Sequence, residues 1–381
     1  MDASSVGMGT QRPTMKSIFT LIALLTHVAT AETSTVFIAT RAEGIYATTL
    51  DQQKGTLSAP VLAAAAGNTG FLAKHPNRPI LYAAGQVDKK SGIVTAYKII
   101  QNGQLSQINQ QPTKGSRLCH ISLDGTQQIL LGANYGQSYV ISYPIQADGS
   151  IGSSVSKHNH KGSSVHPKRQ TKPHAHSIYS GPKNKFAYAP DLGADKIFIY
   201  KIDPQTAQLT PAGSATAPAG AGPRHMKFGR NGEQAYVLNE LSLNISVYNY
   251  DATTGELNHT QLVNTLPEGQ DKQGMTCSEI RVAPNGKSIY CANRDIANKG
   301  RDSLSVFKIT ANGTITRTQT ISAGVSIPRN FNIDPSGKWL LVGGQNSNNI
   351  KVFQIDPISG QLSNTGQEIS VPKVACIEFS D

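Results

Sequence analysis

The chain has 381 residues and a formal net charge of +11, from 35 Lys and Arg against 24 Asp and Glu. Its length alone would suggest two or three domains. The basic balance does not indicate a nucleic-acid partner, because the chain shows no helix, RRM or OB motif for that role and its densest basic stretch has little aromatic interleaving.

The N-terminus has the three regions of a secretory signal peptide. Lys16 supplies a positive charge, residues 18–25 form a short apolar run, and Ala29-Thr30-Ala31 is a small-residue cleavage site. The run is too short for a permanent membrane anchor. We therefore predict a signal peptide over residues 1–31 with cleavage near Ala31, a secreted or periplasmic mature protein, and no membrane association after cleavage.

The true start is a separate question. Met15 lies immediately before the charged region, and translation from Met15 would give a more ordinary signal peptide. Residues 1–14 are therefore a candidate for a segment that lies upstream of the true start codon. The alternative to export is a disordered tag on a cytoplasmic protein.

Beyond this segment one unit is repeated seven times. Each copy has a small apolar strand, a turn with Gly and Pro, Asn or Asp, a strand with Tyr, a strand ending in Tyr or Phe, and a Gly-x-Leu turn; the copy from Met226 to Leu257 is the clearest. The last turn residue recurs mostly at roughly 45–50 residues, the spacing of propeller blades. These residues are Leu57, Leu105, Ile151, Leu209, Leu257, Ile315 and Leu362.

The copies predict the fold class. Apolar and polar residues alternate over short runs bounded by turn residues, which is typical of half-buried antiparallel strands. A single four-stranded sheet cannot bury both faces, so neighbouring blades must pack around a channel. We predict an all-β, seven-bladed β-propeller with four-stranded antiparallel blades, forming a single domain over residues 32–381.

The two ends of this domain predict how the ring closes. Residues 374–379 form a lone apolar strand, and the first copy, which opens at Thr35, lacks the strand that precedes the turn elsewhere. Pairing of the N- and C-terminal strands would complete the first blade and remove the last open edge.

A basic insertion interrupts the fourth copy at about residues 152–173. It is polar and has no periodicity, so we expect a loop over one mouth of the propeller. Such a loop either recruits an anionic substrate or stays solvated.

The four cysteines are Cys119, Cys277, Cys291 and Cys376, with no CxxC or Cys/His metal spacing. Export permits disulfides without requiring them, because a core of this size needs no cross-link. Cys277 and Cys291 are the candidate pair.

Signatures of serine hydrolases, zinc hydrolases and nucleotide enzymes are missing. Polar residues recur instead in two registers of the repeat. After the second strand come Asp191, Glu240, Arg294 and Gln345, and before the first strand come His176, Arg224 and Arg329, with His174 and His225 alongside. Because first strands start and second strands end on the same rim, we expect both registers to meet at one mouth of the channel.

Each of these residues has a plain structural explanation when taken singly. A carboxylate at a blade turn commonly caps the turn, and a lone Arg commonly forms an ion pair. Several cations converging on one rim are costly unless a ligand compensates them, which favours a site for a small anionic, oxygen-rich molecule. Arginine donors suit a carboxylate, a phosphate or a developing oxyanion, and a His beside a Glu suits proton transfer. A metal site at His174 and His176 lacks matching ligands, so we predict no metal and no cofactor.

At these residues the chain resembles the seven-bladed propeller lactonases, a family that includes bacterial 6-phosphogluconolactonases and fungal carboxy-cis,cis-muconate cyclases. The resemblance covers nearly the whole mature chain. It is carried by residues 174–177 (HAHS), 191–195 (DLGAD) with Tyr200, 220–225 (GAGPRH), 239–240 (NE), 293–294 (NR), and 328–331 (PRNF) with 334–337 (DPSG).

The resemblance implies site residues. As catalytic residues it implies His176, Arg224, Glu240 and Arg294, and as substrate-binding residues His174, Asp191, His225, Arg329 and Gln345. One departure is Asp295, where these lactonases tend to have a small residue. Its carboxylate could pair with Arg294 and weaken the grip of that residue on an anion.

The resemblance also implies a function. We expect metal-independent hydrolysis of a sugar-type lactone by a monomer. The substrate is either 6-phospho-D-glucono-1,5-lactone, giving 6-phosphogluconate as in the pentose phosphate pathway of carbohydrate metabolism, or an unphosphorylated aldonolactone, which export favours. The alternatives are a muconate-type cycloisomerase that forms a lactone and a non-catalytic propeller that binds a partner at its rim.

Overall fold

The structure is a computed structural model that describes residues 1–5, 7–9 and 33–380. Most of the predicted signal peptide, including Lys16 and the cleavage site near Ala31, lies outside the described residues. No helix in the described part of the chain is long and apolar enough to cross a membrane.

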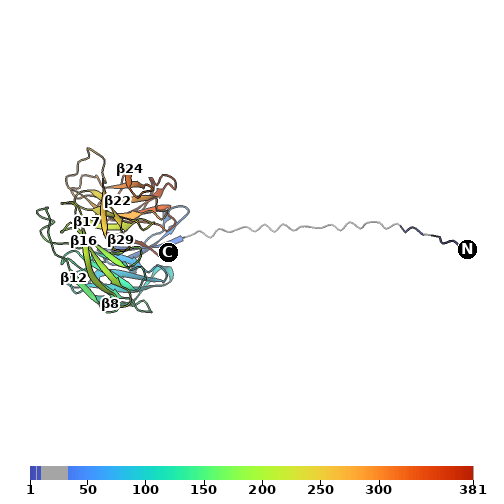
Figure 1. The fold of residues 1–381 in the computed structure, drawn as a ribbon, viewed down its shortest axis with the longest axis horizontal. Coiled ribbons are helices and arrows are strands. Elements are labelled where there is room, and N and C mark those ends of the chain that lie inside the picture. The colour runs from blue at the N-terminus through green and yellow to red at the C-terminus, as the bar shows by residue number, and fades with distance from the viewer. Residues whose placement is uncertain (6, 10–32, 381) are drawn as a thin grey trace. The chain divides into compact units, whose positions relative to one another are not determined.

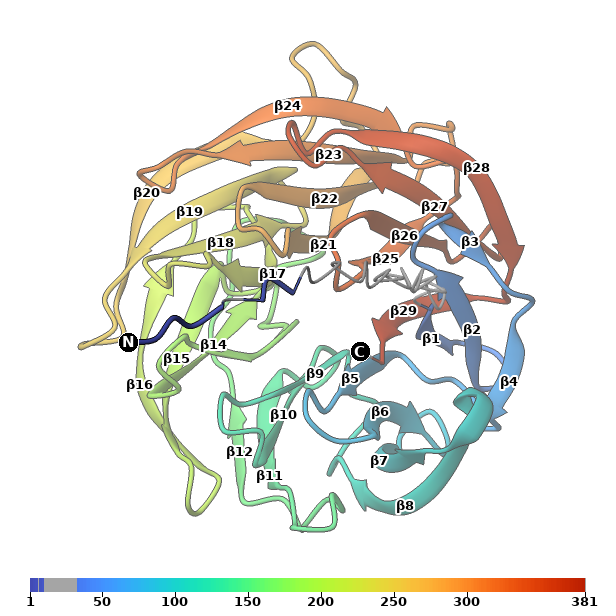
Figure 2. The ribbon, with the colours of Figure 1, turned by 90° about the vertical axis from the view of Figure 1, so that its right-hand side faces the viewer.

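Seven antiparallel sheets surround a central axis (Figures 1 and 2). The first blade has the order β29 (Val374–Phe379), β1 (Thr33–Thr40), β2 (Ile45–Asp51) and β3 (Thr56–Leu57), and β4 (Val61–Ala64) also pairs with β2. The second has β5 (Phe71–Lys74), β6 (Ile80–Gln86), β7 (Gly92–Ile99) and β8 (Leu105–Pro112), with a short 3₁₀ turn, η1 (Gln101–Gly103), before β8.

The third and fourth blades continue in chain order. The third has β9 (His120–Leu123), β10 (Ile129–Asn134), β11 (Tyr139–Pro144) and β12 (Ser156–Asn159). The fourth has β13 (Tyr179–Ser180), β14 (Phe186–Asp191), β15 (Lys196–Asp203) and β16 (Gln208–Thr216).

The last three blades are the most regular. The fifth has β17 (Pro223–Phe228), β18 (Gln234–Asn239), β19 (Asn244–Tyr250) and β20 (Leu257–Asn264). The sixth has β21 (Met275–Val282), β22 (Ser288–Asp295), β23 (Ser303–Ile309) and β24 (Ile315–Ser322). The seventh has β25 (Pro328–Ile333), β26 (Trp339–Gly344), β27 (Asn349–Ile355) and β28 (Leu362–Ser370).

The predicted closure is confirmed. β29 pairs antiparallel with β1, from Val36 opposite Phe379 to Thr40 opposite Val374, so the C-terminal strand becomes the innermost strand of the first blade. The prediction that the strands are half-buried is confirmed only for outer strands such as β20. Second strands such as β18 and β26 are buried at every residue, because each lies between two blades.

The repeated Tyr and the repeated Gly turn form one contact between successive blades. In four blades a second-strand Tyr donates its hydroxyl hydrogen to the Gly carbonyl of the next blade's turn: Tyr82 to Gly149 (3.0 Å), Tyr188 to Gly255 (2.9 Å), Tyr236 to Gly313 (3.0 Å) and Tyr290 to Gly360 (2.8 Å). At the junction of the seventh and first blades, Trp339 donates to the Gln52 carbonyl at 2.8 Å and its ring lies against Gly55. Packing between successive blades therefore explains why Tyr and the Gly turn recur in the sequence repeat.

Two predictions about loops and cysteines need correction. The insertion at about residues 152–173 is not all loop, because Ser156–Asn159 form β12, the outer strand of the third blade. The candidate pair Cys277 and Cys291, which the sequence left open, does not form a disulfide, since all four cysteines are free in the described part of the chain. Cys277 faces Asn293 across the ladder and Cys291 faces Ile280, so the two thiols are out of register.

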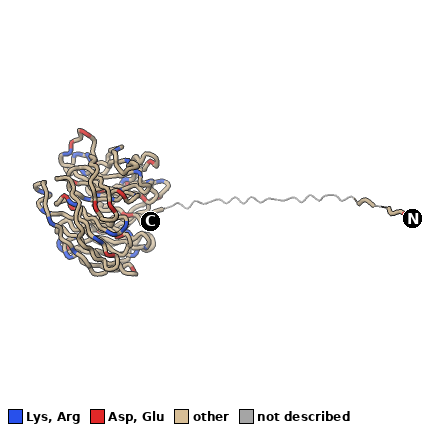
Figure 3. Tube along the Cα trace, in the orientation of Figure 1, with Lys and Arg blue, Asp and Glu red and all other residues tan. Residues whose placement is uncertain are grey.

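The charged residues are dispersed. Figure 3 shows Lys and Arg positions spread over the propeller rather than gathered on one element. The net charge therefore does not by itself define a binding face.

The Gly contact between blades predicts a stability difference. Gly255 and Gly269 both have a positive φ, of 81° and 77°, but a Cβ on Gly255 would lie 2.8 Å from Cγ of Phe186, whereas one on Gly269 would meet nothing within 4 Å. Backbone strain alone costs about 1 kcal/mol at either position. We expect Gly255→Ala to lower the free energy of unfolding by about 2 kcal/mol more than Gly269→Ala, measured by denaturant titration. Equal losses would contradict this packing.

Candidate active site

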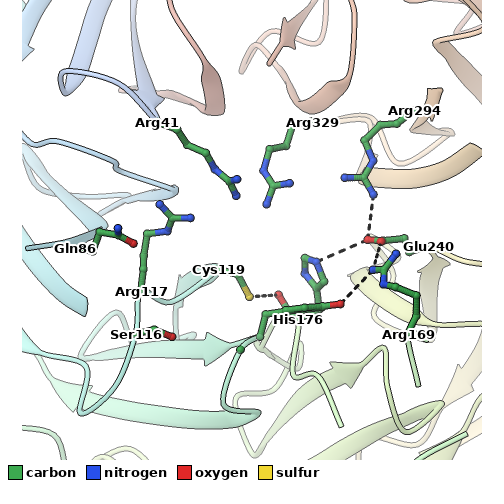
Figure 4. A pocket seen from close by; sticks show the side chains of 12 residues that line it. Arg41, Gln86, Ser116, Arg117, Cys119, Arg169, His176, Glu240, Arg294 and Arg329 are labelled. Carbon is green, nitrogen blue, oxygen red and sulfur yellow. Dashed lines mark hydrogen bonds and ion pairs between the residues drawn. The ribbon is translucent and has the colours of Figure 1, made fainter. Parts of the chain in front are cut away.

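A cavity of about 480 Å³ opens at one end of the central channel (Figure 4). Its walls come from the rim where first strands begin and second strands end. The lining side chains are those of Arg41, Gln86, Ser116, Arg117, Cys119, Tyr135, Arg169, His176, Glu240, Arg294 and Arg329, with Gly136. The structure thus brings four predicted residues, His176, Glu240, Arg294 and Arg329, into one cavity.

Glu240 follows β18 and lies among cations. Its Oε1 is 2.7 Å from Nη2 of Arg169, and its Oε2 is 2.9 Å from Nε of Arg224 and 3.1 Å from Nη2 of Arg294. Burial raises the pKa of Glu240, but Arg294, Arg224 and Arg169 outweigh it and lower the pKa to about 2. Glu240 is therefore a carboxylate at neutral pH.

His176 lies beside this carboxylate, just before β13. Its Nε2 is 3.8 Å from Oε2 of Glu240, and its buried Nδ1 has no hydrogen-bond partner among the described residues. Burial, followed by the charges of Arg224, His225 and Arg329, holds the pKa of His176 well below its usual value. The imidazole is therefore neutral and able to accept a proton.

Arg41, Arg117 and Arg329 form a second group, which we call the arginine trio, that Figure 4 shows pointing into the cavity apart from Glu240. Nη1 of Arg117 donates to the Asn68 carbonyl at 2.9 Å. The side chains of Arg41 and Arg329 make no hydrogen bond or ion pair with any described residue, and Nε of Arg41 is buried without a partner.

The trio carries uncompensated positive charge. Burial, and then the neighbouring arginines, lower the pKa of Arg41 to about 10 and hold the pKa of Arg329 well below its usual value. Among the described residues that line the cavity, Glu240 is the one carboxylate facing five arginines. An anionic ligand would relieve this repulsion.

Arg224 does not line this cavity. Its side chain is buried behind Glu240, where it is 2% exposed, and it also donates to the carbonyl of Ser278. The reason is local, because Arg224 is the extra residue of a β-bulge between Pro223 and His225 in β17. Bulges re-aim side chains at the rims of barrels and beside active sites. Arg329 occupies the corresponding bulge in β25.

The other predicted binding residues also lie outside the lining. His225 lies behind Arg224, and His174 stacks on Tyr135 with ring centroids 4.3 Å apart. The Asp191 carboxylate accepts from three backbone N–H groups and contacts Nδ1 of His160 at 2.7 Å, so it holds the turn after β14. Gln345 is tied through its backbone to Ile327.

Asp295 does not weaken Arg294. Its carboxylate turns away to Arg301, with oxygens 2.8 Å from Nη2 and 3.1 Å from Nε, and it also accepts from backbone N–H groups of its own loop. The predicted pairing of Asp295 with Arg294 is therefore wrong. Arg294 instead contacts Glu240 and donates from Nη2 to the Cys277 carbonyl at 2.8 Å, and it lines the cavity.

The part of the basic insertion after β12, residues 160–173, contributes Arg169. Oγ of Ser164 donates to Asp195 at 2.6 Å, and the Gln170 amide donates to the Leu192 carbonyl at 2.9 Å. These contacts hold Arg169 over Glu240, where it also donates to the Tyr135 hydroxyl at 3.2 Å. The insertion is therefore a strap that completes one wall of the cavity.

Sequence reasoning missed several lining residues that obey the same registers. Arg41, Gln86 and Tyr135 lie at or just after the ends of second strands, and Arg117 lies just before a first strand. They belong to the weaker copies of the repeat, and carrying the two registers through those copies would have found them. No comparable signal marked Arg169.

No group of three or more His, Cys, Asp or Glu side chains is arranged to hold a metal ion in the part of the chain that the structure describes.

Known proteins place this architecture in a family. Residues 26–379 match the family model described as Lactonase, 7-bladed beta-propeller. The chain is 36% identical over 341 residues to 6-phosphogluconolactonase of Bacillus subtilis, covering 88% of this chain and 94% of that protein. It is 32% identical over 310 residues to 6-phosphogluconolactonase of Formosa agariphila, covering 80% and 86%.

Among solved structures, periplasmic gluconolactonase of Pseudomonas aeruginosa superposes with a TM-score of 0.85 at 30% identity, covering 91% of this chain and 99% of that one. Family match, sequence relatives and structural neighbour agree over nearly the whole propeller. The chain belongs to the seven-bladed β-propeller lactonase family.

Proposed function

We propose that this protein hydrolyses a phosphorylated sugar lactone, with 6-phospho-D-glucono-1,5-lactone as the substrate to test first. The observation that carries the proposal is a cavity with two chemically different halves. One half holds Glu240, His176 and Arg294, and the other holds the arginine trio. The names of the relatives, 6-phosphogluconolactonase and gluconolactonase, support the reaction class.

The first half suits the hydrolytic step. Water adds to the lactone carbonyl carbon while the His176 imidazole takes its proton, and the nearby Glu240 carboxylate stabilises the imidazolium that forms. The guanidinium of Arg294 donates hydrogen bonds to the carbonyl oxygen as it becomes an oxyanion. The tetrahedral intermediate then expels the ring oxygen, which takes the proton back from His176 and leaves a hydroxy acid.

The pKa of His176 fits this role once substrate is bound. In the empty cavity, burial and neighbouring arginines hold it well below its usual value. A substrate anion beside those arginines offsets part of their charge, so the imidazole becomes a stronger base when the substrate is present.

The second half suits a phosphate. Arginine forks match phosphate oxygens, and guanidinium groups without acceptors lose no existing hydrogen bond on binding. Arg41 and Arg329 are such groups. A phosphate dianion at the trio would leave the lactone ring to face the half that holds His176.

The proposed reaction uses no metal ion. Both oxygens of Glu240 are already held by guanidinium groups, and a cation would be repelled by the arginines around it.

We further propose that the protein is exported and begins at Glu32 when mature. Export taken alone favours an unphosphorylated lactone, but the arginine trio in the cavity outweighs it in our choice of a phosphorylated substrate. The charged, apolar and small-residue regions of the N-terminus support this, and one relative is a periplasmic enzyme. N-terminal sequencing of protein recovered from outside the cytoplasm is expected to begin at Glu32. A protein that keeps residues 15–31 would contradict export by cleavage.

The hydrolytic half predicts losses of turnover. We expect His176→Ala and Arg294→Ala each to lower kcat on 6-phospho-D-glucono-1,5-lactone at least about 10²-fold, because one removes the base and the other an oxyanion donor. Hydrolysis is measured by alkali uptake above the spontaneous rate. Dialysis of the wild type against EDTA is expected to leave that rate unchanged.

Full activity in both variants would rule out this catalytic half. Activity lost to EDTA and restored by a metal would rule out the metal-free reaction. A wild type that leaves both the phosphorylated and the unphosphorylated lactone at their spontaneous rates would rule out the lactonase.

The arginine trio predicts substrate preference. We expect Arg329→Gln to raise KM for the phosphorylated lactone at least about tenfold, since a charged hydrogen bond is worth about 1.5–3 kcal/mol. KM for glucono-1,5-lactone should change less than about twofold, because that substrate has no group for the trio. Arg230→Gln, on the exposed surface, is the matched control. An equal change in KM on both lactones would contradict a phosphate subsite.

A further inference from the structure

A series of hydrogen-bonded, buried side chains lies behind Glu240 and does not line the cavity. It runs from Arg224 in β17 through His225 to Glu279 in β21 and Asn330 in β25, and all four residues are buried. The amide of Asn330 donates to Oε2 of Glu279 at 2.6 Å, and its oxygen accepts from the backbone N–H of Ile377 in β29 at 2.8 Å. This series of hydrogen-bonded side chains therefore connects β29, the closing strand of the propeller, to the Glu240 carboxylate.

Glu279 determines which nitrogen of His225 carries the proton. Burial raises the pKa of Glu279, but Arg281 and His225 outweigh it and hold the pKa well below its usual value, so the side chain is a carboxylate. A carboxylate only accepts hydrogen bonds, and its Oε1 is 3.1 Å from Nδ1 of His225. The proton of the neutral ring therefore lies on Nδ1.

The other nitrogen of His225 is then an acceptor. Burial is the largest cause that lowers the pKa of His225 to about 4, so the ring is neutral at pH 7 and Nε2 holds a lone pair. That lone pair faces Nη1 of Arg224 at 3.2 Å. With the opposite tautomer, an N–H would point at the guanidinium and the contact would be lost.

Arg224 transmits this orientation to Glu240. Its Nη1 also donates to the carbonyl of Ser278, and its Nε donates to Oε2 of Glu240 at 2.9 Å. A guanidinium is planar with fixed angles between its donors, so acceptors on Nη1 set the direction of the Nε–H bond. Glu240 is in turn the carboxylate beside His176.

We propose that His225 and Glu279 are positioning residues, which orient Arg224 and through it hold Glu240 at the distance from His176 that the reaction requires. The kinetic part of this proposal rests on the proposed function, whereas the tautomer of His225 does not. The competing explanation is packing alone, since the His225 ring also contacts the rings of His120 and His176 at 5.3 and 5.4 Å.

Two amide variants separate hydrogen bonding from packing. In His225→Gln the amide end reaches the position of Nε2, so its oxygen can accept from Arg224. In His225→Asn the amide reaches only the position of Nδ1, so the bond to Glu279 can form but Arg224 loses its acceptor. On 6-phospho-D-glucono-1,5-lactone, we expect His225→Asn to lower kcat at least about tenfold while KM stays within about twofold of the wild-type value. On the same substrate, His225→Gln should retain most of the wild-type kcat.

His120→Gln is the matched control, because His120 is buried in the same channel and contacts the His225 ring without contacting Arg224. It is expected to keep the wild-type kcat. His225→Asn with wild-type kcat, or His225→Gln as slow as His225→Asn, would overturn the proposal.

A spectroscopic measurement on the wild type does not depend on any variant's activity. Nitrogen-15 NMR of histidine-labelled protein at pH 7 is expected to show His225 with a protonated Nδ1 and a bare Nε2, its signals being assigned by their loss in His225→Gln. A protonated Nε2, or a doubly protonated ring, would overturn the proposal even if His225→Asn fails to fold. If the wild type hydrolyses neither lactone, the proposed function fails while this measurement still decides the tautomer.

Discussion

The charge of Glu240 is the constraint on which the rest of the site depends. Buried guanidinium groups repel one another and lose their hydration, so a cavity lined by five of them needs a counter-charge. Glu240 supplies it to Arg169, Arg224 and Arg294, all within 3.1 Å. Because these cations hold Glu240 ionised, neither the carboxylate nor the arginines around it would be stable in this arrangement alone.

Glu240 neutralises only part of the positive charge of the cavity, because it lies on one side of the cavity. Arg41 and Arg329 lack a partner, and their pKa values are lowered as a result of burial and mutual repulsion. The free energy spent in holding these cations together is recovered when an anion enters. The proposed affinity for an anionic substrate and the electrostatic cost of the empty cavity would therefore have the same origin.

Such an arrangement requires a frame that does not relax to separate the charges. The contacts of Tyr and Trp with the Gly turns of neighbouring blades supply it at five of the seven blade junctions, and the pairing of β1 with β29 closes the ring. Bulges in β17 and β25 then turn Arg224 and Arg329 to different depths of the same channel. The frame thus places Arg329 in the lining of the cavity and Arg224 behind Glu240.

The fold and part of the candidate site could be predicted from the sequence, because the residues that determine them recur in each copy of the repeat. The Tyr of one blade and the Gly turn of the next recur at regular spacing, so they indicate the number of blades, and the missing first strand of the first copy indicates closure by β29. The two rim registers located His176, Glu240, Arg294 and Arg329 for the same reason. Only the tertiary structure decided the direction of each side chain, since that depends on bulges and on partners distant in the chain. It placed Arg224 and His225 behind the cavity, where Ser278 and Glu279 of the next blade bind them, and it brought Arg169 from the strap onto Glu240 of the fifth blade. It also turned Asp191 and Asp295 to hydrogen-bond donors of their own loops, which the repeat pattern does not mark.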